Sequence, residues 1–62
     1  MTLLETYRAN AAAERRAAES TNLPNRRAMH ERSAITWEEM AANAEALIEL
    51  TQVNLAAKAN LA

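Results

Sequence analysis

The stretch TWEEMAANAEALIEL, residues 36–50, decides the fold of this chain. Its apolar residues recur every three or four positions, which is the spacing of one face of an α-helix. These residues are Trp37, Met40, Ala41, Ala44, Leu47 and Ile48. The stretch also holds the only tryptophan and four of the eight acidic residues. It therefore predicts an amphipathic helix whose apolar face needs a partner.

The composition around this stretch favours helix almost everywhere. Half of the 62 residues are hydrophobic, but sixteen of these are alanine, and the chain has no glycine and one proline. Alanine, leucine, glutamate and arginine are good helix formers, and few β-branched or aromatic residues are left for strands. A chain of this length is near the limit of independent stability. Because it has no cysteine and one histidine, disulfides are excluded and a structural metal is disfavoured, which leaves oligomerisation as the remedy.

Two local signals divide the chain into an all-α hairpin. Thr2 and Glu5 have the spacing of a capping box at a helix start. Pro24 interrupts the helical pattern, because proline lacks an N–H group but is accepted in a first helical turn. The expected elements of this single domain, residues 1–62, are a short helix over 3–19, a loop over 20–24 and a long helix over 25–60. A second capping box begins at Thr36, so a break near residues 33–36 stays open as an alternative.

Folding back at the loop pairs the two helices antiparallel and sets Tyr7 near Trp37 and Leu4 near Met40. Leu23 is expected to plug the loop end of the hairpin. The predicted hairpin core is Leu4, Tyr7, Leu23, Trp37 and Met40. At 1.5 Å per residue the helices span roughly 27 Å and 54 Å. The long helix therefore has no intramolecular partner beyond Asn43.

The uncovered half of the long helix carries most of the aliphatic residues, so a second copy is the simplest cover. We expect a homodimer in which the long helices cross antiparallel and form a four-helix bundle, although the charge distribution alone does not fix that direction. The predicted dimer interface is Ala44, Leu47, Ile48, Thr51, Asn54 and Leu55. Thr51 and Asn54 are polar residues that could fix the register. The alternatives are an unrelated protein partner or a disordered last turn.

No residue pattern predicts catalysis, a cofactor or a metal. His30 belongs to neither the His-Glu-x-x-His zinc motif nor the Glu-x-x-His pair of di-iron bundles. Nothing supplies an activated nucleophile, and the absence of glycine excludes the usual phosphate-binding loops. The most favoured function is a non-enzymatic assembly or adaptor module that binds other protein chains.

Arginines near the loop suggest an alternative function, a small dimeric regulator that binds nucleic acid. The candidate contacts are Arg15, Arg16, Arg26 and Arg27. The formal charge of −1 and the lack of interleaved aromatic residues argue against it. The first 32 residues carry +2 and the remaining 30 carry −3, an asymmetry that could orient a partner.

The beginning of the chain lacks the apolar run of a secretory signal, and no stretch reaches the roughly 20 apolar residues of a membrane span. We therefore expect a soluble cytoplasmic protein with no membrane partner.

One set of residues around the proline consists of Leu23-Pro24-Asn25, Arg27, Ser33-Ala34, Trp37 and Met40-Ala41. This set resembles a pattern in short uncharacterised helical proteins encoded by alphaproteobacteria. It covers about a third of the chain. The resemblance implies a bacterial cytoplasmic setting and a helical hairpin, and it assigns no site residue.

Overall fold

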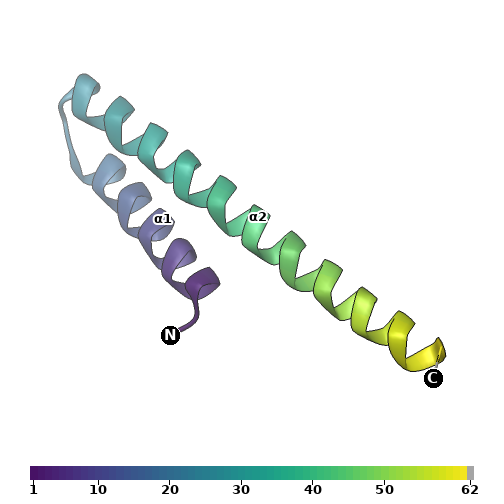
Figure 1. Ribbon diagram of the computed structural model, residues 1–62. Helices are drawn as coiled ribbons and strands as arrows, with labels where there is room; N and C mark the ends of the chain where they lie inside the picture. Colours follow the sequence, from purple (N-terminus) through teal and green to yellow (C-terminus); the bar gives the residue numbers. More distant parts are fainter. Residues whose placement is uncertain (62) are drawn as a thin grey trace.

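The computed structural model describes residues 1–61, which form two antiparallel helices and no strand (Figure 1). Helix α1 spans Leu3–Ser20 and helix α2 spans Pro24–Leu61. These bounds differ from the predicted ones by at most one residue. The prediction of an all-α hairpin with a short and then a long helix is confirmed. The molecule is elongated, with extents of 59 × 19 × 11 Å, because α2 continues far beyond the start of α1.

Both helix starts follow the local signals. The Thr2 hydroxyl accepts a hydrogen bond from the Glu5 N–H and donates one to the Glu5 carboxylate, each at 3.1 Å. At the second start, the Arg27 N–H donates to the Leu23 carbonyl at 2.9 Å, directly before Pro24. Leu23 is therefore the cap residue, and its own N–H donates to the Thr21 hydroxyl at 3.2 Å.

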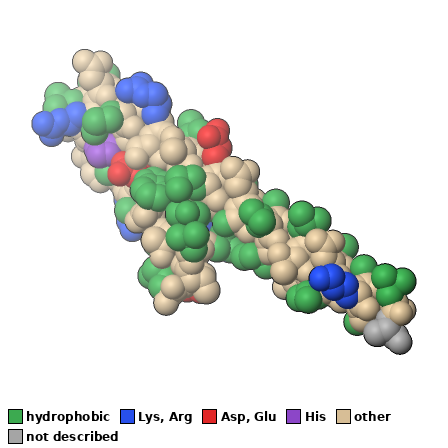
Figure 2. Space-filling model, in the orientation of Figure 1, with side chains coloured by type: hydrophobic (Ala, Val, Ile, Leu, Met, Phe, Trp, Pro, Cys, Tyr) green, Lys and Arg blue, Asp and Glu red, His purple; other side chains and the backbone are tan. Residues whose placement is uncertain are grey.

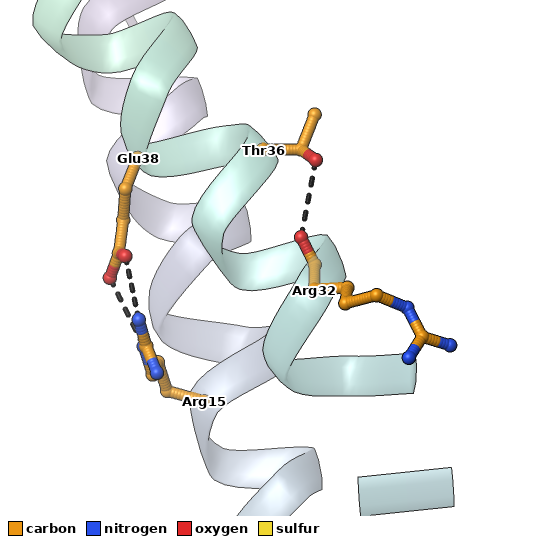
Figure 3. Close-up of polar contacts among 4 residues, drawn as sticks. All are labelled: Arg15, Arg32, Thr36 and Glu38. Atoms are coloured by element: carbon orange, nitrogen blue, oxygen red, sulfur yellow. Dashed lines mark hydrogen bonds and ion pairs between the residues drawn. The ribbon is translucent and has the colours of Figure 1, made fainter. Parts of the chain in front are cut away.

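Helix α2 runs without interruption through residues 33–36. The Thr36 hydroxyl donates to the Arg32 carbonyl at 3.1 Å, one turn earlier in the same helix (Figure 3). A hydroxyl used in this way satisfies a bond inside the helix and does not cap a new helix start. The alternative of a break near Thr36 is therefore wrong.

The contact between the helices is built from alanine. Four residues are buried, two from each helix, and we call them the alanine seam: Ala11, Ala18, Ala34 and Ala41. Ala34 has no exposed surface at all. Side chains this small let two helices approach closely, so little room remains for larger residues between them.

The large side chains lie beside the seam. Tyr7 and Trp37 are half-buried, and their rings pack with centroids 5.9 Å apart and planes tilted by 35°. This contact confirms the predicted pairing of Tyr7 with Trp37. Leu4 is also half-buried.

Two members of the predicted hairpin core lie on the surface. Leu23 is 54% exposed and Met40 is 36% exposed. Leu23 is the cap residue of α2 and lies in the loop beyond the end of α1. Met40 is displaced because its neighbour Ala41 occupies the contact. The buried positions of α2 are Ala34 and Ala41, with Trp37 and Ala44 half-buried beside them, so Met40 lies at the edge of the contact.

Candidate protein interaction surface

Three polar side-chain contacts link the two helices. Arg15 binds Glu38 through two nitrogens, with N–O distances of 2.7 and 3.1 Å (Figure 3). The Arg8 Nη2 atom lies 2.8 Å from the Glu45 Oε2 atom. The hydrogen bond from Arg15 holds the pKa of the Glu38 carboxyl below its ordinary range, and the same bond raises the pKa of Arg15. Both side chains are exposed, so they orient the helices more than they stabilise them.

His30 forms the third contact. Its Nδ1 lies 2.7 Å from a carboxylate oxygen of Glu14, in a partly buried position. This pairing accounts for the only histidine as a structural link between α2 and α1. Within residues 1–61, no group of three or more potential metal-binding side chains lies together.

The four arginines predicted to contact nucleic acid have different environments in the structure. Arg15 binds Glu38, and Arg27 donates to the Thr21 carbonyl at 3.0 Å. Arg16 and Arg26 are exposed and make no ion pair among the described residues. A hollow of about 380 Å³ near the loop is lined by Arg15, Ala18, Glu19, Arg27 and Glu31. Its two acidic side chains make it a poor cradle for phosphate.

The tail of α2, residues 45–61, is exposed along its whole length. Figure 2 shows hydrophobic side chains along this part of the rod, on the face in view. The exposed large hydrophobic residues of the tail are Leu47, Ile48, Leu50, Val53, Leu55 and Leu61. Leu47 is 64% exposed and Leu55 is 62% exposed. Exposed large apolar side chains gathered in one segment are typical of a protein contact site.

The residues predicted to form a dimer interface all lie at the root of this tail or within it. Ala44 is half-buried, and the other five are exposed: Leu47, Ile48, Thr51, Asn54 and Leu55. The Thr51 hydroxyl donates to the Leu47 carbonyl at 2.9 Å. The hydrogen-bonding group of Thr51 is therefore satisfied within α2.

An apolar hollow marks the point where the tail leaves α1. It has a volume of about 490 Å³ and is lined by Thr2, Leu3, Leu4, Ala44, Leu47 and Ile48. Leu3 was not among the predicted site residues, because it lies beside the apolar stripe of its own helix. Leu3 belongs to the candidate interaction surface only because α1 places it opposite the root of the tail.

The shape of the molecule shows how much surface remains uncovered. Its accessible area is 4910 Å², whereas a compact protein of 6.8 kDa exposes about 4000 Å². Its radius of gyration is 16.7 Å, against about 11 Å for a compact domain of this length. The excess of roughly 900 Å² reflects the elongated shape, in which α2 extends well beyond the start of α1.

The chain matches no protein-family model, no curated protein and no solved structure. The resemblance to alphaproteobacterial hairpin proteins therefore stays a prediction. Neither helix, within residues 1–61, has the length and apolar character needed to cross a bilayer.

Proposed function

We propose that this chain is a small non-enzymatic assembly module that forms a homodimer through the tail of α2. The observation that carries the proposal is the tail itself, in which every residue from 45 to 61 is exposed and six are large and apolar. Burying each such side chain contributes about 1.5–3 kcal/mol. Self-association is the simplest way to gain this free energy, because each copy supplies both the surface and its cover.

Light scattering across a dilution series tests the proposal. The native chain is expected to show about twice its monomer mass of 6.8 kDa. Leu47→Glu combined with Ile48→Glu places two charges on the apolar part of the tail and is expected to give a monomer. A matched control, Ala56→Glu with Asn60→Glu, adds the same charge on the face that carries Glu49 and is expected to stay dimeric. A native chain that is monomeric at every concentration, or a double glutamate variant that stays dimeric, contradicts the proposal.

A native monomer would contradict the homodimer and would leave the tail free for a different protein, so an adaptor function would replace the proposal. The nucleic-acid alternative has weaker support, because Arg15 and Arg27 are engaged within the hairpin. It would replace the proposal if duplex RNA bound with an affinity that falls steeply with salt, and if Arg16→Ala with Arg26→Ala removed that binding.

A further inference from the structure

The face of α2 that meets α1 continues into the tail. Under α1 this face consists of Ala34, Trp37, Ala41 and Ala44, at alternating steps of three and four residues. The same steps lead on to Ile48, Thr51, Leu55 and Lys58, because residues at this spacing stay on one side of a helix. In the described residues, no helix covers this second half of the face.

The apolar hollow lies at the junction between the covered and uncovered halves. One wall is the first turn of α1, with Leu3 and Leu4, and the other is the root of the tail, with Ala44, Leu47 and Ile48. A helix that continues the line of α1 along the tail would close this hollow. The open position therefore suits a helix that presents apolar side chains to this hollow.

We propose that this position is filled by the tail of a second copy of the chain, running antiparallel. The inference rests on the proposed self-association and assigns its geometry. Thr51 of each copy lies opposite Leu55 of the other, and Ile48 lies opposite Lys58. The last turns of the partner's tail then lie near the hollow formed by Leu3 and Leu4.

The hairpin itself excludes a parallel partner on this face. Helix α2 is continuous from Pro24 to Leu61, so a parallel copy in register would bring its own residues 24–44 into the space that α1 occupies. An antiparallel copy in the proposed register brings only its tail, residues 45–61, onto the uncovered half. The two tails are equal in length, so each covers the other.

The side chains on the shared face suit this contact. Ile48 and Leu55 supply apolar surface, and the Thr51 hydroxyl is already bonded to the Leu47 carbonyl at 2.9 Å. Lys58 can lay its aliphatic stem along Ile48 of the other copy while its ammonium group stays in water. Leu47 lies beside this face and lines the hollow.

This geometry also changes the expected shape of the dimer. Each α1 stays at its own end, so the two short helices do not lie side by side. The four helices form an extended rod two helices thick, in place of the four-helix cross-section expected from the sequence.

Cysteine crosslinking tests the register, because the chain has no cysteine of its own. The two variants are Ile48→Cys and Lys58→Cys, both at exposed positions. In the proposed register residue 48 of one copy faces residue 58 of the other. Two copies of residue 48 are offset by ten residues, about 15 Å along the axis. A disulfide needs Cα atoms within about 7 Å of each other.

Under mild oxidation, a mixture of the two variants is expected to give a covalent dimer that contains one chain of each. Each variant alone is expected to give none. Circular dichroism and light scattering of the reduced variants provide the control for helicity and mass.

The outcomes separate this inference from the proposed function. Crosslinks in both single-variant samples indicate a parallel pair in register, and a crosslink in only one of them indicates a shifted antiparallel register. A dimeric mass without any crosslink places the contact elsewhere on the chain. Each of these results overturns the proposed register and leaves self-association standing. A monomeric mass for the native chain overturns both.

Discussion

Replacing Ala34 by leucine tests whether the alanine seam sets the distance between the helices. Ala34 is fully buried between α1 and α2, so the three carbon atoms that leucine adds have no space to enter. Overpacking of this kind costs about 1–3 kcal/mol. Alanine and leucine differ in helix propensity by only a few tenths of a kcal/mol, so the packing term should dominate the result.

The expected result is a lower thermal midpoint, followed by circular dichroism at 222 nm. For a domain of this size, each 1 kcal/mol shifts the midpoint by about 4–8 °C, so we expect a fall of roughly 4–24 °C. All variants must be compared at one chain concentration, because association makes the midpoint depend on concentration.

Ala13→Leu provides the matched control, because Ala13 is an exposed alanine within α1. It makes the same chemical change without entering the seam and should leave the midpoint within about 2–4 °C of the native value. If Ala34→Leu melts at the same temperature as this control or above it, then the seam does not set the helix distance and our account of the core is wrong.

Three further predictions concern the polar contacts. Thr2→Ala should lower the free energy of unfolding of the hairpin by about 1 kcal/mol, measured by urea unfolding. Thr2→Asp should lose little of this stability, because aspartate also caps a helix. Equal stability of the native chain and both variants would show that the Thr2 cap contributes nothing. The Glu38 carboxyl should titrate below its ordinary value of 4.5 in an NMR pH series and return to that value in Arg15→Ala. The pKa of Glu38 is lower in the folded than in the unfolded chain, so any stabilisation from this contact is present above pH 4.5 and is lost as the pH falls through the folded-state pKa. An unshifted pKa of Glu38 in the native chain would argue against the ion pair in solution. A double-mutant cycle on Glu14→Ala and His30→Ala should give a coupling of about 0.5–1.5 kcal/mol, whereas additive effects would show that the 2.7 Å contact contributes nothing.

The candidate interaction surface could be predicted only in part. Its aliphatic content and its position on the long helix followed from the sequence, as did five residues that the structure leaves exposed: Leu47, Ile48, Thr51, Asn54 and Leu55. The apolar hollow at its root could not be predicted, because it is formed by Leu3 and Leu4 of one helix and Ala44 of the other. Asn54 follows Leu47 by seven residues, which places both on a line beside the face that continues from α1.

The two helices, their ends and the mismatch in their lengths could be predicted from the sequence. These features depend on signals that act within one or two turns, such as the Thr2 cap and the missing N–H group of Pro24. An 18-residue helix cannot cover a 38-residue one, so an uncovered tail follows from length alone.

The tertiary structure alone decided which face of each helix meets the other. The apolar spacing allowed both Met40 and Ala41 as contact residues, and the large side chain was the more obvious choice. The structure buries Ala41 and Ala34 and leaves Met40 and Leu23 at the surface. The reason is that the distance between two helices depends on the side chains of both at once, and small residues facing small residues permit a close approach that no single helix reveals.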